Sequence, residues 1–271
     1  MSDLAVTMPR VGPLLRDWRR RRRLSQLDLA LDAGVSARHL SFVETGRSRP
    51  SAEMVLHLAE ELEVPLRDRN QLLLAAGYAP RYGQRALDDP ELQPVRAALQ
   101  LVLDGHEPYP AAVVDRHWNL VAANRSVAMV TEGVAPELMA PPTNVLRLSL
   151  HPDGMAPRIA NLGEWRTHLI ERLGRQIGTT GDEELIALRD EIAAYPAPPG
   201  DDHHEEGTAG QIVVPLRLRR PDRSQVTFFS TVATFGTAVD ITVAELAIES
   251  FFPADAQTAR AVADYVRRQE P

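Results

Sequence analysis

The sequence predicts an all-α domain of five helices followed by an α+β domain with a mainly antiparallel sheet. Between residues 12 and 76, apolar residues recur at helical spacing, and residues that end helices interrupt them at short intervals. After Pro110, short apolar runs typical of strands alternate with helical stretches. Charge divides the chain as well. Residues 1–50 contain ten arginines and five acidic residues and so carry +5, whereas the whole chain carries −7, which leaves −12 for the rest. We therefore expect two domains that differ in periodicity and in charge.

Five helices are expected in the first domain, residues 1–80. Ser25, Ser36 and Ser51 each precede a helical pattern, where a serine hydroxyl accepts a free amide of the first turn. Gly34 and Gly46 follow such patterns and supply the left-handed turn that ends a helix. The first apolar stripe starts at residue 11 and ends in the arginines 19–23, and the other helices are expected over residues 26–33, 36–44, 52–62 and 65–76.

The second and third of these helices form a unit that can read double-stranded DNA. Two short helices joined through Gly34 place the second across the first. Their shared core is expected to contain Leu29, Ala30, Val35, Leu40 and Val43. The exposed side of the third helix then reaches base edges in the major groove, where Arg38 can contact guanine and Ala37 a thymine methyl. The base-reading candidates are Ser36, Ala37, Arg38, His39, Ser41 and Phe42, and the phosphate-binding candidates are Gln26, Arg47, Arg49 and Ser51.

This stretch resembles the Xre/Cro family of helix-turn-helix repressors over residues 11–76. The matching positions are Arg16, Ser25, Gln26, Leu29, Ala30, Gly34, Val35, Ser36, Glu44, Gly46 and Pro50. The resemblance implies that the first residues of the third helix read bases and that the glutamine opening the second helix binds phosphate. Phe42 departs from the family pattern, which often has a polar base reader there, so it either stacks on the DNA or packs against the protein. The alternative of a helical bundle with arginines for solubility explains neither Gln26 nor the Ser-Arg-His face.

A linker and connecting helix are expected over residues 81–109, followed by the second domain, residues 110–271. The region before residue 94 is rich in Pro, Gly, Tyr and Asp, as linkers are. The connecting helix is predicted over residues 95–104. Strands are predicted over residues 111–115, 118–123, 212–219, 225–235 and 240–246, and helices over 125–132, 145–150, 163–176, 183–194 and 254–268.

Three separated segments of the second domain, read in order, resemble the MmyB-like ligand-binding domain. They are PAAVVDRHWNLVAAN, NVLRLSLHPDGMAPRIANLGEWRTHLIERL and FFSTVATFGTAVDITVAELAIESFFP. The resemblance covers residues 95–270 and implies a PAS-like fold with an apolar cavity that accepts a fatty acid or a similar small molecule. It does not imply which effector the domain takes.

The sequence offers apolar candidates for lining such a cavity, although such residues more often belong to an ordinary core. Arg147 lies in an otherwise apolar helix and is the residue expected to meet a carboxylate at the cavity mouth. His117, Asn124 and Arg158 are weaker polar candidates, each also compatible with a surface or capping role. The apolar candidates are Trp118, Leu120, Val127, Val130, Leu146, Leu150, Trp165, Leu169, Phe229 and Phe235.

Several classes of site are excluded or disfavoured. The chain has no cysteine, so disulfides, thiolate metal sites and cysteine nucleophiles are excluded. The acidic run 201–206 has metal-ligand chemistry, but consecutive residues point in different directions, so we expect a solvated loop and no metal site. No catalytic motif is present, and no cofactor is expected beyond the effector. Without a signal peptide or a long apolar run, the chain is expected to be cytoplasmic and not bound to a membrane.

These observations predict a ligand-responsive transcription regulator that binds DNA as a homodimer and is not an enzyme. Two alternatives remain open. One is an enzyme that its first domain targets to DNA, with His151 and Asp153 as candidate catalytic groups. The other is an antitoxin-like protein-interaction module that represses its own promoter.

Overall fold

The computed structural model describes residues 10–196 and 213–269, and these divide into two compact units. The first, called the helical unit, contains residues 10–86, 178–180 and 237–244. The second, called the sheet unit, contains residues 87–177, 181–196, 213–236 and 245–269. The acidic run 201–206 and the start of the strand expected over residues 212–219 lie outside the described residues.

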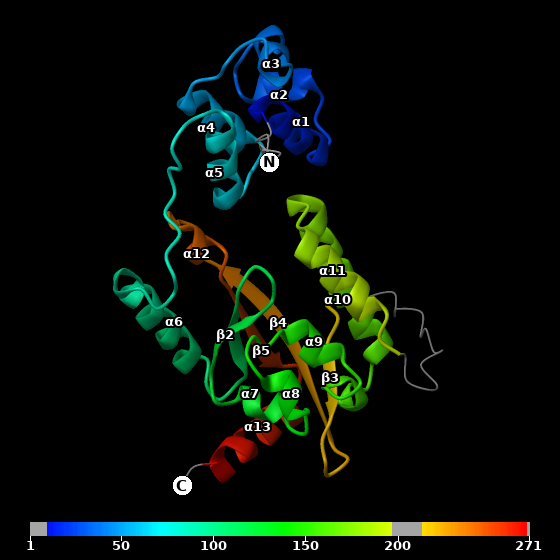
Figure 1. Ribbon diagram of the computed structural model, residues 1–271. Helices are drawn as coiled ribbons and strands as arrows, with labels where there is room; N and C mark the ends of the chain where they lie inside the picture. The colour runs from blue at the N-terminus through cyan, green and yellow to red at the C-terminus, as the bar shows by residue number, and fades with distance from the viewer. Residues whose placement is uncertain (1–9, 197–212, 270–271) are drawn as a thin grey trace, which may run out of the picture. The chain divides into compact units, whose positions relative to one another are not determined.

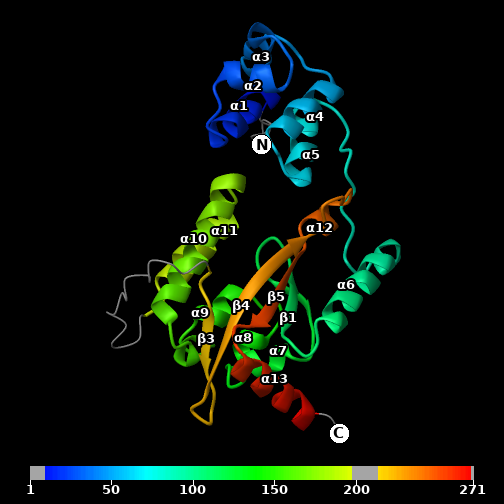
Figure 2. The same cartoon turned by 180° about the vertical axis from the view of Figure 1, so that it is seen from behind.

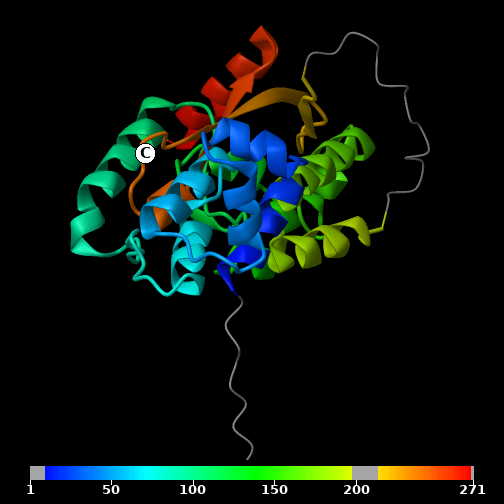
Figure 3. The same cartoon turned by 90° about the horizontal axis from the view of Figure 1, so that it is seen from above.

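Five helices form most of the helical unit, as predicted (Figure 1; blue to cyan in Figure 3). They are α1 (Val11–Arg21), α2 (Gln26–Asp32), α3 (Ala37–Glu44), α4 (Ala52–Glu61) and α5 (Leu66–Ala75). Ser25, Ser36 and Ser51 each accept a backbone N–H of the first turn of α2, α3 and α4. Gly34 and Gly46 have positive φ after α2 and α3, as a left-handed helix end requires. The predicted caps and stops therefore set these helix ends.

The core of the helical unit joins α1, α2 and α3 closely. Leu29, Ala30, Leu40 and Val43 are buried as predicted, whereas Val35 is half-buried. Gly12 allows α1 to approach the end of α3, because a Cβ there would lie 2.5 Å from the Val43 carbonyl oxygen. This close approach brings the side chains of α1 within reach of α3.

The sheet unit contains a curled five-stranded sheet in the order β2-β1-β5-β4-β3, with every pairing antiparallel (Figure 2). The predicted α+β class with a mainly antiparallel sheet is therefore confirmed. The longest pairing joins β4 to β5, from Phe228 opposite Pro253 to Thr234 opposite Ala247. The strands are β1 (Ala111–Val114), β2 (Leu120–Ala123), β3 (Leu216–Arg219), β4 (Gln225–Thr234) and β5 (Ala247–Pro253).

Helices cover this sheet on two sides. The helix α6 (Gln93–Gly105) packs through Leu99 and Leu103 against Ala111 and Val113 of β1. The other face belongs to a larger core to which most of the remaining helices contribute. The remaining helices of the described residues are η1 (Pro90–Leu92), α7 (Val127–Val130), α8 (Pro136–Met139), α9 (Val145–Leu150), η2 (Ala156–Arg158), α10 (Leu162–Thr180), α11 (Glu183–Ala193), α12 (Ile241–Ala244) and α13 (Ala256–Gln269).

The strand predicted over residues 240–246 is wrong. This segment forms the short helix α12, which Asp240 opens by accepting the Thr242 N–H at 2.9 Å. The alternating β-branched residues suggested a strand, but the aspartate cap favours a helical turn. The fifth strand instead follows at 247–253, where Glu249 interrupts the apolar pattern. The strand expected from residue 118 starts at Leu120, because Trp118 has φ 68° and cannot continue an extended chain.

Candidate DNA-reading surface and ligand cavity

The base-reading candidates lie on one side of α3 and at its start. Ser36 and Arg38 are exposed, and Ala37, His39, Ser41 and Phe42 are half-buried; we call these six residues the reading face. Leu40 and Val43 lie on the opposite, buried side. The Ser36 hydroxyl accepts the His39 N–H at 3.1 Å, so its first task is to cap α3. The helix therefore presents a mixed polar and aromatic surface while its apolar side anchors it.

Two arginines flank Phe42 on this surface. The guanidinium carbon of Arg38 lies 5.4 Å from the centre of the Phe42 ring, and that of Arg47 lies 5.9 Å from it. Both distances are typical of cation–π contacts. Phe42 thus acts as an apolar platform that holds two exposed cations beside the reading face. The sequence had left open whether Phe42 packs or stacks, and the half-buried ring leaves part of its surface accessible.

A buried ion pair fixes α3 to α1. The Arg19 Nε and Nη2 atoms donate to the two oxygens of Glu44 at 2.6 and 2.9 Å. The Gln26 Nε2 atom adds a third hydrogen bond to Glu44, at 2.7 Å. Burial alone would raise the pKa of Glu44, but the hydrogen bonds from Arg19 and Gln26 outweigh it and hold this pKa below its usual range. The contact of Gln26 with phosphate stays a prediction, and its amide here orients the start of α2.

The other phosphate candidates have different surroundings. Arg49 donates from Nη2 to the Ala76 carbonyl oxygen at 2.9 Å and lies over the Tyr78 ring, so it holds the end of α5. Ser51 caps α4 by accepting the Met54 N–H. Arg47 is exposed beside Phe42. Arg47, Arg49 and Ser51 are all exposed, so all three are accessible to a polyanion, while Arg49 and Ser51 also hold helix ends.

The sheet unit contains a partly open apolar cavity of about 80 Å³ between one face of β1 and β5 and the helices α7, α9 and α10. Ala112 and Val114 of β1 and Phe251 of β5 line its sheet side. Six of the sequence candidates also line it, namely Leu120, Val127, Val130, Leu146, Trp165 and Leu169. Their contact with a ligand stays a prediction.

Five predicted cavity residues lie elsewhere. Arg147 pairs with Glu191 at 2.7 and 2.8 Å, so its charge is already matched outside the cavity lining. Trp118 packs under the Arg172 guanidinium, at 4.3 Å, and Leu150 is buried in the core. Phe229 stacks on Phe252, and Phe235 packs in the cluster that contains α6. Helical and strand periodicity identified these residues as apolar, but it does not show which of them border a void.

Glu249 is the charged residue among the cavity-lining residues that sequence reasoning missed, because a strand was not expected there. It is 8% exposed, lines the cavity and accepts a hydrogen bond from Arg172 at 3.1 Å. His168 stacks on Trp165, and burial together with the charges of Arg172 and Arg175 lowers its pKa. The single charged residue within the apolar run LAIESFF was the signal that could have identified Glu249.

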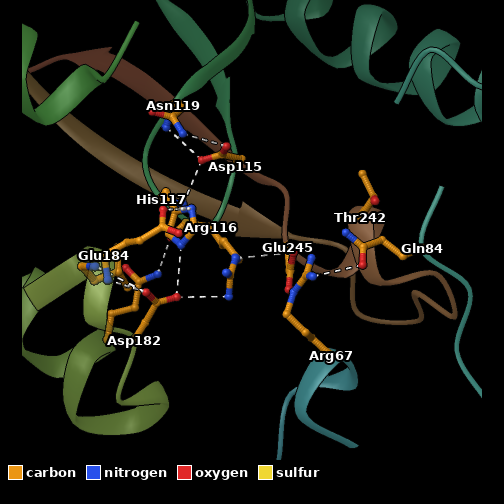
Figure 4. A network of polar contacts seen from close by, with 12 residues as sticks. Arg67, Gln84, Asp115, Arg116, His117, Asn119, Asp182, Glu184, Thr242 and Glu245 are labelled. Atoms are coloured by element: carbon orange, nitrogen blue, oxygen red, sulfur yellow. Dashed lines mark hydrogen bonds and ion pairs between the residues drawn. The ribbon is translucent and has the colours of Figure 1, made fainter. Parts of the chain in front are cut away.

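The minor polar candidates have structural roles. The His117 ring bonds Asp182 at 3.1 Å, and Arg116 pairs with the same carboxylate at 3.0 Å (Figure 4). Burial would raise the pKa of Asp182, but His117 and Arg116 outweigh it and lower the pKa. The Asn124 Oδ1 atom accepts the Ala111 N–H, and Arg158 donates to backbone carbonyl oxygens such as that of Val130. These side chains therefore fix loops and strand ends.

No helix within the described ranges is long and apolar enough to cross a membrane. The same ranges contain no group of three or more His, Asp or Glu residues arranged to hold a metal ion.

Comparison with known families agrees with this architecture. Residues 15–68 match the helix-turn-helix family, and residues 95–264 match the family described as the MmyB-like transcription regulator ligand binding domain. A helix-turn-helix reader followed by a ligand-binding domain defines a ligand-regulated, DNA-binding transcription regulator. The chain belongs to the MmyB-like transcription regulators, with an Xre-type helix-turn-helix. The resemblance to these two families that the sequence suggested is confirmed.

No curated protein matches the chain. Among solved structures, one described as an RNA-binding light-oxygen-voltage receptor aligns with 98% of this chain at 12% identity and a TM-score of 0.29. The chain spans 65% of that structure's length. A likeness at this level supports no argument about function.

Proposed function

We propose that the chain binds operator DNA as a homodimer, with the reading face of each protomer in a major groove of one half-site. The half-sites are expected about 34 Å apart, one turn of B-DNA. The observation that supports this most is the pair of exposed arginines, Arg38 and Arg47, beside the half-buried Phe42 of α3, a helix that the buried Glu44 pair holds in place. In this proposal Arg38 reads a base and Arg47 contacts phosphate.

The test begins with a random duplex library from which the wild-type protein selects its operator. Arg38→Ala should weaken binding to that operator by about 1–3 kcal/mol and relax the preference at one base pair. Arg47→Ala should weaken binding to all sequences and reduce the slope of log K against log salt by about 1. Arg189→Ala, at an ion pair on α11, is the matched control. If anisotropy titrations show wild-type affinity for Arg38→Ala, the assigned reading face is wrong.

Dimerisation has its own measurement. Light scattering coupled to gel filtration should give twice the mass of the 30.0 kDa chain. Selected operators should also contain inverted repeats, since a two-fold dimer reads two-fold sites. A monomer that selects single, unrepeated sites would contradict the homodimer.

The cavity supports a small-molecule effector with an apolar part, such as a fatty acid or a molecule of similar character. Its lining is mostly aliphatic and aromatic, and its volume suits a short chain or one part of a longer one. Ligand binding would then favour one state of the reader, with a coupling of about 1–3 kcal/mol. Native mass spectrometry of the purified protein, followed by organic extraction, should reveal a bound lipid-like molecule, and operator affinity should change when it is removed.

A further inference from the structure

The cavity has few polar groups, and their hydrogen-bonding capacity is uneven. Its lining contains the side chains of Thr131, Ser149 and Glu249 among apolar neighbours. The Thr131 hydroxyl already donates to the Val127 carbonyl oxygen at 3.1 Å. The Ser149 hydroxyl accepts the indole N–H of Trp165 at 3.0 Å. The Thr131 hydroxyl therefore offers its lone pairs to a molecule that enters, whereas the Ser149 hydroxyl can also donate its hydrogen.

Glu249 adds a carboxylate to this acceptor-rich lining. Its Oε1 atom accepts from Arg172 Nη1 at 3.1 Å and from the Ser230 hydroxyl at 3.0 Å. Its Oε2 atom forms no hydrogen bond within the described parts of the chain. This oxygen is not among the fully buried atoms, so it remains accessible to a hydrogen-bond donor that enters the cavity.

The arginine that pairs with Glu249 does not make the cavity lining cationic. Arg172 is not a lining residue of the cavity, and its guanidinium lies against the Trp118 ring. Its Nη2 atom is buried without a hydrogen-bond partner in the described residues. Arg172 therefore balances the charge of Glu249 from outside the cavity lining, while the Glu249 carboxylate borders the cavity.

We infer that the cavity selects a neutral ligand whose polar head donates a hydrogen bond, such as a primary alcohol or amide, over an ionised carboxylate. This inference rests on the proposed ligand-binding function. A hydroxyl or amide N–H would supply the donor that Glu249 Oε2 lacks, and a hydrogen bond to a charged acceptor is among the stronger kinds. An ionised carboxylate brings a second negative charge and only acceptors, so its oxygens would be desolvated beside Glu249. The effector class is thus a fatty alcohol or fatty amide more than a fatty acid anion.

The test compares three ligands with one six-carbon chain, chosen for the small cavity. Hexan-1-ol, hexanamide and hexanoate are titrated into the full-length protein at pH 7.5 by calorimetry, where hexanoate is ionised because carboxyl pKa values lie at about 4–5. We expect hexanoate to bind at least tenfold more weakly than hexan-1-ol. Glu249→Gln removes the charge and keeps the shape, so it should reduce this ratio at least threefold. Glu191→Gln, which frees Arg147 outside the cavity, should leave the ratio unchanged.

The outcomes separate this inference from the function on which it rests. Equal affinities for hexan-1-ol and hexanoate in the wild type overturn the head-group inference and leave ligand binding intact. Binding of none of the three ligands overturns both. Wild-type discrimination that persists in a folded Glu249→Gln protein overturns the role of Glu249. The wild-type ratio requires no variant, so the inference stays falsifiable even where Glu249→Gln fails to fold.

Discussion

Glu44 in the helical unit and Glu249 in the sheet unit are both buried carboxylates paired with an arginine, yet their environments differ. Glu44 uses both oxygens, which accept from Arg19 and Gln26. Glu249 uses one oxygen and borders a cavity. A buried carboxylate whose two oxygens both accept hydrogen bonds stabilises a fold. A carboxylate with hydrogen bonds at one oxygen only can still accept one from a ligand. The difference separates the scaffold of the DNA reader from the candidate recognition group of the sensor.

The largest expected effect comes from removing the partner of the saturated carboxylate. Arg19→Ala should lower the free energy of unfolding by about 3–5 kcal/mol, because it leaves Glu44 buried without its cation. Denaturant unfolding measures this change, with Arg189→Ala as control, for which a change of about 0.5 kcal/mol or less is expected. If Arg19→Ala lowers the free energy of unfolding no more than the control does, the Glu44 pair does not stabilise the fold as proposed, and the two carboxylates do not differ in this respect.

The second prediction compares the two carboxylates directly. Glu44→Gln should cost about 1.5–3 kcal/mol, the contribution of hydrogen bonds to a charged group. Glu249→Gln should cost less than Glu44→Gln, because Glu249 accepts hydrogen bonds at one oxygen only, although this change also leaves Arg172 without its counter-charge. Thermal unfolding of both variants at one pH gives the order, and an inverted order would contradict our interpretation of the two sites.

The third prediction concerns the backbone approach that makes the Glu44 pair possible. Gly12→Ala should destabilise the protein by about 1–2 kcal/mol, because the added Cβ would overlap the Val43 and Glu44 carbonyl oxygens. Gly174 lies within α10 with open space at its Cβ position, so Gly174→Ala should instead stabilise by about 0.4–1 kcal/mol. Opposite signs in denaturant unfolding are the expected result, and equal signs would place the close contact of α1 and α3 in doubt.

The smallest expected effect is a pH dependence. The folded-state pKa of Glu44 lies below its ordinary value of about 4.5, so its contribution to stability is present above about pH 4.5 and is lost as pH falls through the folded-state pKa. The difference in unfolding free energy between wild type and Glu44→Gln should therefore shrink on acidification. An exposed control, Glu61→Gln, should show no comparable trend. A wild-type advantage over Glu44→Gln that grows at low pH would contradict the assigned direction.

Local signals predicted much of the structure. Serine residues before a helical pattern and glycines after it predicted the helices of the DNA-binding domain. The apolar run at 145–150 predicted α9 with its observed bounds. Predictions failed where tertiary context decides. Asp240 caps a turn that alternation had suggested was a strand, and Arg147 pairs with a carboxylate 44 residues away. The cavity was only half anticipated, because periodicity identifies buried residues but not the spaces between them. The hydrogen bonds of Glu249 come from Arg172 of α10 and Ser230 of β4 and both reach one oxygen. Sequence spacing does not reveal such contacts between distant elements.

The placement of the three tryptophans makes the protein its own optical reporter. Trp18 lies in the core of the helical unit, Trp118 lies beneath Arg172, and Trp165 borders the cavity with its indole N–H bonded to Ser149. A double Trp18→Phe, Trp118→Phe variant would emit from Trp165 alone. Its emission would follow effector binding in real time without a dye, while labelled operator reports on the reader in the same cuvette.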